Sequence, residues 1–269
     1  MGRTGGHLQS PAWHLVLPVL ALLLWSLSGS AWARWLFLPA WVLATQLIAT
    51  GSLEAARLRR RAWLGQYLRD GSPWHHRLRG GAVMVARHQL LGALLALVLL
   101  VKLRGLPLAG WPLLLAGAVG VALVRGWLHR RLAPHVIEAR LPAVTRRLLV
   151  APVAGLLALA LVGMALWLPQ PWLVDLGWEA ALLRHLPAGE GGSLLAFFER
   201  LAAAAEITRA WAMQNAEAQL SLGAPLALLG WLLMLLNQGA LAWAFVRLLV
   251  GAEALRGQGI TNRRQEEAP

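Results

Sequence analysis

Histidine is the residue of this chain best suited to binding a metal, but its eight copies are not spaced as metal ligands. His75 and His76 are adjacent, so on a helix their side chains point in different directions, and Pro134 separates His129 from His135. No pair stands in the HxxxH or HExxH pattern that places two imidazoles on one helix face. The sequence therefore predicts no metal site, and we expect these side chains to be solvated or to contact lipid headgroups.

The chain also lacks the residues of nucleophilic and phosphate-transfer chemistry. It has no cysteine and no GxSxG motif, and residues 189–192 lack the lysine and the preceding strand that a phosphate-binding loop requires. In the two basic segments, residues 54–88 and 125–147, the acidic residues are only Glu54, Asp70 and Glu138, which form no DxxD-like cluster. We therefore predict no catalytic residue, no cofactor-binding residue and no enzymatic activity.

Two pairs of polar residues lie inside otherwise apolar stretches, Thr45-Gln46 and Asn237-Gln238. An amide surrounded by hydrocarbon needs a hydrogen-bond partner. Gln46 and Asn237 are predicted to lie at similar depths, so one interpretation is a direct contact between their helices, worth roughly 1 kcal/mol. The other interpretation is that Gln46, Asn237 and Gln238 line a polar path for a solute.

The elements that must position these residues are predicted to be membrane-spanning helices. About 20 apolar residues are needed to cross the ~30 Å hydrocarbon core of a bilayer. Six stretches meet or approach this length, at residues 15–33, 35–53, 89–103, 106–124, 148–168 and 222–246. We predict an all-α, polytopic transmembrane bundle in which Arg34 joins the first two helices in a tight hairpin and residues 104–107 join the next two.

Basic residues are distributed unevenly between the two sides of these spans. Nineteen of the 25 Lys and Arg residues fall in the segments 1–14, 54–88, 125–147 and 247–269. Because cationic loops stay in the cytoplasm, we predict that both termini are inside. The Arg-, Ala- and Leu-rich composition favours a bacterial inner membrane. An alternative is a signal peptide cleaved after residues 31–33, which would leave five spans.

The predicted organisation alternates membrane and aqueous segments. It comprises a transmembrane hairpin (1–53), a basic cytoplasmic loop (54–88), a second hairpin (89–124), a second basic loop (125–147), a fifth span (148–168), a periplasmic helical segment (169–221), a sixth span (222–246) and a cytoplasmic tail (247–269). Arg57, Arg59, Arg60 and Arg61 are expected on a helix that continues the second span. They fix the topology or bind anionic lipid headgroups or a cytoplasmic partner. Because topology explains the net charge of +13, no nucleic-acid partner is predicted.

The segment 169–221 is the one sizeable region outside the membrane. We expect a short amphipathic helix at about 174–186 and a long one, capped by Ser193, that runs to about residue 220. Phe198, Leu201 and Trp211 belong to an apolar stripe on the long helix, and Glu199, Glu206 and Arg209 belong to its polar complement. The stripe is expected to pack on the short helix or the membrane, or to bind a periplasmic partner.

These features favour a non-enzymatic integral membrane subunit of a larger envelope, secretion or transport assembly, with membrane lipids and other membrane or periplasmic proteins as partners. The alternative is a channel or uncoupled transporter for a small solute. A lipid-modifying membrane enzyme is a third possibility, which the missing acidic cluster disfavours. A channel predicts a wet route through the bundle, whereas a subunit predicts a dry bundle and an exposed apolar face on its soluble part.

Overall fold

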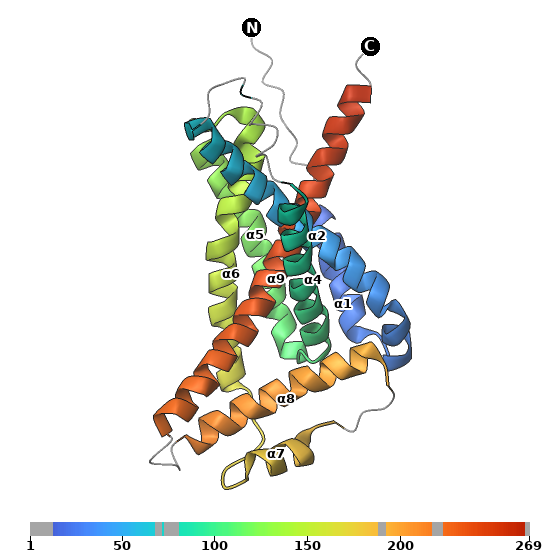
Figure 1. The fold of residues 1–269 in the computed structure, drawn as a ribbon, viewed down its shortest axis with the longest axis vertical. Coiled ribbons are helices and arrows are strands. Elements are labelled where there is room, and N and C mark those ends of the chain that lie inside the picture. Colours follow the sequence, from blue (N-terminus) through green and yellow to red (C-terminus); the bar gives the residue numbers. More distant parts are fainter. Residues whose placement is uncertain (1–12, 68–71, 73–80, 188–191, 217–222, 267–269) are drawn as a thin grey trace.

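The computed structural model describes residues 13–67, 72, 81–187, 192–216 and 223–266, and all regular secondary structure in these residues is helical (Figure 1). The elements are α1 (Trp13–Leu27), α2 (Ser30–Tyr67), α4 (Ala82–Arg104), the 3-10 turn η1 (Leu108–Gly110), α5 (Trp111–Leu132), the 3-10 turn η2 (Glu138–Arg140), α6 (Leu141–Trp167), α7 (Trp178–His185), α8 (Leu194–Asn215) and α9 (Gly223–Glu266).

Five of these helical segments are long and apolar enough to cross a membrane. They are Ser30–Arg60, Ala82–Arg104, Leu108–Leu132, Leu141–Trp167 and Ala224–Arg256. Proline lies in the first turn of α5 and of α6, where its missing N–H leaves no helical hydrogen bond unmade. The prediction of an all-helical membrane protein with several spans is confirmed at this level.

The first two helices differ from the sequence prediction in where they meet. α1 ends at Leu27 rather than at residue 33, and α2 begins at Ser30, so Arg34 lies inside α2 and not in the turn. The Ser28 hydroxyl and backbone N–H both donate to the carbonyl of Trp25, at 2.7 and 3.2 Å, and this closes α1 early. With 15 residues, α1 is shorter than the five spanning segments.

The longest helix, α9, crosses the bundle and touches α2 backbone to backbone. Gly51 of α2 faces Gly251 of α9, and a Cβ atom built on Gly51 would lie 3.2 Å from the Gly251 Cα atom. A Cβ atom built on Gly251 would overlap the carbonyl oxygen of Leu47. Only glycine permits this approach, so this pair of residues sets the point at which α2 and α9 cross.

The last helix continues into the segment that the sequence analysis assigns to a cytoplasmic tail. α9 continues without a break past residue 246, and its 44 residues give it a length of about 66 Å. Beyond that point Leu248, Leu249, Val250 and Ala254 are all buried. The helix therefore continues beyond residue 246, where the sequence predicts the span to end, and side chains of the next two turns also pack into the bundle.

The core of the bundle is a continuous apolar cluster contributed mainly by α2, α4, α5, α6 and α9. Its fully buried side chains include Phe37, Leu99, Leu103, Leu241 and Phe245. Trp25 of α1 joins it by stacking near Phe37, with ring centroids 6.3 Å apart.

A second layer, made of α7 and α8, covers one end of the bundle (Figure 1). α8 lies across that end and α7 lies beyond α8, with a small core of Leu173, Ala181, Ile207 and Ala210 between them. The chain enters this layer along residues 171–176, where Gln214 accepts from the Leu173 N–H at 2.7 Å and Asn215 donates to the Leu173 carbonyl at 3.0 Å. The predicted Ser193 cap is confirmed, since its hydroxyl accepts from the Ala196 N–H at 3.2 Å.

Candidate functional site

The α8 helix turns Glu199, Glu206 and Arg209 toward the bundle, whereas Arg200 is exposed. Lys102 and Arg104 stand in the last turn of α4. Lys102 forms an ion pair with Glu206, and the Arg104 Nε atom lies 2.5 Å from Glu199. Glu199 and Glu206 are seven residues apart, which is two helical turns, so both carboxylates face α4. α8 is therefore fixed to the bundle by charge as well as by apolar contact.

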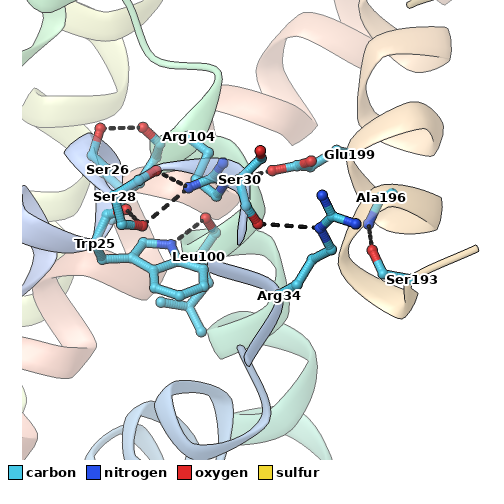
Figure 2. Close-up of polar contacts among 11 residues, drawn as sticks. Trp25, Ser26, Ser28, Ser30, Arg34, Leu100, Arg104, Ser193, Ala196 and Glu199 are labelled. Carbon is cyan, nitrogen blue, oxygen red and sulfur yellow. Dashed lines mark hydrogen bonds and ion pairs between the residues drawn. The ribbon is translucent and has the colours of Figure 1, made fainter. Parts of the chain in front are cut away.

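Arg104 joins three helices at this end of the bundle (Figure 2). Besides Glu199 of α8, its Nη1 atom donates to the backbone carbonyl of Ser28 at 2.9 Å, in the turn between α1 and α2. Its guanidinium carbon lies 5.7 Å from the centre of the Trp25 ring, within the range of a cation–π contact. Trp25 in turn donates to the carbonyl of Leu100 in α4 at 2.8 Å. Arg104 thus fixes the α1–α2 turn and α8 to the same point.

Glu206 is the second junction, and it accepts from three side chains on three helices. The donors are Lys102 of α4, Arg209 of α8 at 2.9 Å and Asn237 of α9 at 2.7 Å. Burial by itself would raise the pKa of the Glu206 carboxyl. The charges and hydrogen bonds of Lys102 and Arg209 outweigh burial, so its pKa lies below the ordinary value.

Arg209 is among the most deeply buried charged side chains in the described chain, with 7 % of its surface exposed. Its Nε atom pairs with Glu206, while its Nη1 atom reaches the sulfur atoms of Met213 and Met234 at 3.7 and 3.8 Å. A thioether sulfur is a weak hydrogen-bond acceptor. One side of this guanidinium is therefore only weakly satisfied by the protein.

A cavity of about 620 Å³ lies between α8 and the end of the bundle. Its walls come from α4, α6, α8, α9 and the segments that follow α4 and α6. The polar part of the lining is Lys102, Arg104, Gln170, Glu199, Glu206, Arg209 and Gln238, and apolar residues such as Val101, Met164, Leu168 and Leu241 form most of the remainder. An apolar cavity of this size with a few convergent polar groups is typical of a small-molecule binding site.

The three amides predicted from the sequence have separate surroundings. Gln46 is exposed on the outside of the bundle, where it accepts from the Gln89 amide of α4 at 3.1 Å. Asn237 donates to Glu206, and the buried Gln238 lines the cavity. The predicted contact between Gln46 and Asn237 is wrong. The two amides do not share a depth: Leu47, the residue after Gln46, meets Gly251 of α9, whereas Asn237 lies 14 residues earlier in that helix, about 21 Å along its axis.

At the opposite end of the bundle, a buried ion network ties four helices together. Arg146 of α6 holds Glu54 of α2 through two hydrogen bonds, at 3.0 and 2.5 Å, and lies 3.8 Å from Glu253 of α9. Arg125 of α5 pairs with the same Glu253 at 3.0 Å. We interpret this network as structural, because removing one partner of a buried ion pair would leave the other charge uncompensated.

The basic helix predicted after the second span is present as the last part of α2, which runs to Tyr67. Arg57, Arg59 and Arg60 have exposed side chains there, and Arg61 lies on the same helix. They stand at the same end as the Arg146 network, away from α7 and α8 (Figure 1).

The outer side of α8 is apolar at its amino-terminal end. Leu194, Phe197 and Leu201, which share one helix face, are 47 %, 61 % and 58 % exposed. Beside them is a groove of about 720 Å³ that also includes Leu186 and Arg200.

The predicted stripe on α8 is thus divided between different surroundings. Of its three named residues, Leu201 is exposed, Phe198 packs on the bundle core, and Trp211 packs on the small core and donates to the Leu176 carbonyl at 2.7 Å. The residues that sequence reasoning missed as a site are Lys102, Arg104 and the acidic pair of α8. The available signal was two cations at the end of an apolar stretch together with two carboxylates seven residues apart, which share one helix face.

Among the described residues, no group of three His, Asp or Glu side chains gathers in a way that would hold a metal ion. His75 and His76 lie outside the described residues. No family model matches the chain, and no curated protein or solved structure matches it either.

Proposed function

We propose that this chain is a non-enzymatic, multi-pass protein of a bacterial inner membrane and serves as the membrane-embedded subunit of a larger envelope, secretion or transport assembly. The observation that carries the proposal is the orientation of α8. Glu199 and Glu206 form ion pairs with the bundle, while Leu194, Phe197 and Leu201 are left exposed. A helix face that is both apolar and held rigidly in place is preorganised for a partner.

The groove beside this face indicates the chemistry of the partner. Its lining is mainly apolar, and its one charged residue is Arg200, which is exposed. We propose an apolar segment of another membrane or periplasmic protein, with an acidic residue placed opposite Arg200. Burying Phe197 and Leu201 would supply most of the binding free energy, and the ion pair would set the orientation.

The interior of the bundle supports a subunit over a channel. In α9 the cavity lining reaches Leu241, and the side chains beyond it, Phe245 and Leu249, are fully buried in the apolar core with Leu99 and Leu103 of α4. Closely packed apolar side chains are expected for a bundle that anchors a complex.

The proposed orientation places α7 and α8 in the periplasm and the basic end of the bundle in the cytoplasm, with both termini inside. It is supported by the end of α2, which carries Arg57 and lies away from α7 and α8 (Figure 1), and by the ion network of Arg125 and Arg146. Anionic headgroups are the proposed lipid partners of the arginines at 57 and 59–61. A reporter that is active only in the cytoplasm should work when fused after Arg140 and be silent after Gly192.

The docking proposal is tested by purifying the tagged full-length chain from its native membranes in mild detergent. We expect a partner protein at stoichiometric amount with the natural chain. The double variant Phe197→Asp, Leu201→Asp should lose it while remaining as abundant, because both side chains are already exposed.

The matched control is Leu183→Asp on α7, which is also highly exposed and lies outside the groove. It should keep the partner. Retention of the partner by the α8 double variant, or purification of the natural chain alone, would contradict the proposal.

A further inference from the structure

We propose that the cavity beneath α8 binds an anionic amphiphile, a lipid with a phosphate headgroup and at least one apolar chain. This inference concerns the inner side of α8 and does not depend on a partner at its outer side.

The position of the cavity matches the boundary between lipid tails and headgroups. Lys102 and Arg104 occupy the last turn of the α4 span, where cationic side chains reach the headgroup level. The segments after α4 and α6 complete the wall on that side, and residues 168–171 belong to it.

The cavity lining has an apolar part and a charged part, which match the two parts of an amphiphile. Val101, Met164, Leu168 and Leu241 offer an apolar surface to a hydrocarbon chain. The charged residues of α4 and α8 offer the polar part. A fully polar solute would leave the first group without a partner, and a pure hydrocarbon would leave the second group unsatisfied.

The charge of the lining favours an anion. It contains three cationic side chains, Lys102, Arg104 and Arg209, against two carboxylates, Glu199 and Glu206. Glu206 already accepts from Lys102, Arg209 and Asn237. One positive charge is therefore left over, close to Glu206.

Lys102 and Arg209 both line the cavity, and they share one carboxylate, Glu206. The Nη1 atom of Arg209 lies against the sulfur atoms of Met213 and Met234, which are not part of the cavity lining. A phosphate in the cavity would therefore meet the positive charge that Glu206 leaves uncompensated, and hydrogen bonds between a cation and a charged oxygen are roughly twice as strong as neutral ones. Lys102 adds an ammonium on the neighbouring helix. The headgroup is therefore assigned to Lys102 and Arg209.

Because the chain contains no cysteine, a single introduced thiol can report on occupancy. Ala203→Cys places the thiol on the cavity wall, and Ala180→Cys on α7 places one on an exposed surface outside it. The purified full-length variants are labelled with N-ethylmaleimide in neutral detergent, and the rate is followed by mass spectrometry. The added probes are lysophosphatidylglycerol, lysophosphatidylcholine with the same acyl chain, and inorganic phosphate.

At about ten times its Kd, lysophosphatidylglycerol should slow labelling of A203C about tenfold, because only unoccupied cavities react. It should leave A180C unchanged. Lysophosphatidylcholine should protect much less, and inorganic phosphate should not protect.

Three results would overturn the proposal. Equal protection by the two lysolipids would show a crevice that takes any hydrocarbon chain, and protection by phosphate alone would show an ion site. Absence of labelling of A203C under every condition would show that the cavity is closed.

The headgroup assignment is tested by Lys102→Gln in the A203C chain. Glu206 keeps Arg209 and Asn237 as partners in this variant, so α8 should stay in place. The preference for the anionic lysolipid should fall severalfold. Arg34→Gln, which removes a cation outside the lining, should leave the preference unchanged. A preference that survives Lys102→Gln would show that the headgroup binds elsewhere.

Discussion

The crossing of α2 and α9 makes a graded prediction about three glycines. Gly251→Ala would push a methyl group into the carbonyl oxygen of Leu47, and Gly51→Ala would place one 3.2 Å from the Gly251 Cα atom. Gly239 of α9 has open space around its missing Cβ position, with no neighbouring atom within 4 Å. The added methyl group therefore overlaps the backbone at Gly251, makes a tight contact at Gly51 and meets no neighbouring atom at Gly239.

The expected free-energy changes follow from these contacts. Overpacking commonly costs about 1–3 kcal/mol, and a fixed backbone carbonyl places Gly251→Ala at about 3 kcal/mol or more. Gly51→Ala should cost about 1–2 kcal/mol, since a shift of a few tenths of an ångström relieves it. Gly239→Ala should be neutral or stabilise by up to about 1 kcal/mol, because alanine is the better helix former.

The assay is unfolding by titration with SDS in mild-detergent micelles, followed by the fluorescence of the chain's 15 tryptophans. The order of stability should be Gly239→Ala, then Gly51→Ala, then Gly251→Ala. If Gly251→Ala were as stable as Gly239→Ala, α9 would not cross α2 at this point, and the packing described for both helices would be wrong.

Three further changes test the ion networks at the two ends of the bundle. Arg146→Met removes a partner of the half-buried Glu54 and of the buried Glu253 and should cost about 3 kcal/mol in the SDS titration, since breaking a buried pair leaves uncompensated charge. Arg104→Gln should cost about 1.5–3 kcal/mol, the loss of a charged hydrogen-bond junction, and should make the α1–α2 turn more sensitive to protease. Because the Glu206 pKa is lowered in the folded chain, its stabilising effect is present above the ordinary value of 4.5 and is lost as the pH falls through the folded pKa. Below pH 4.5, the melting temperature of the natural chain should therefore fall more steeply with decreasing pH than the melting temperature of the Glu206→Gln variant. Parallel curves for the two proteins would contradict the lowered pKa of Glu206.

Local sequence patterns were sufficient for the helical class and for most of the elements. Five of the six predicted apolar stretches lie in helices long enough to span a membrane, whereas the first forms the shorter α1. The serine at 193 predicted the start of α8. Both features depend on residues that are close together in the chain. The end of α9 could not be placed in the same way, because the two turns after residue 246 are helical and buried for reasons of tertiary packing.

The site itself depended on information that periodicity does not contain. A stripe shows which residues of α8 share a face, but not which neighbour that face meets. Glu199 and Glu206 face the bundle because Lys102 and Arg104 end α4 at that place. The contact of Gly51 with Gly251 joins residues far apart in the sequence, and no local pattern marks it.

The central claim is that the outer side of α8 meets another protein, and site-specific photocrosslinking in native membranes tests it most directly. A photoreactive phenylalanine analogue at position 197, which is exposed, is compared with the same analogue at position 198, which packs on the bundle core. The account predicts a discrete crosslinked protein band from position 197 and none from position 198. Crosslinks from position 197 to lipid alone would contradict it and would make α8 a helix that lies on the membrane surface.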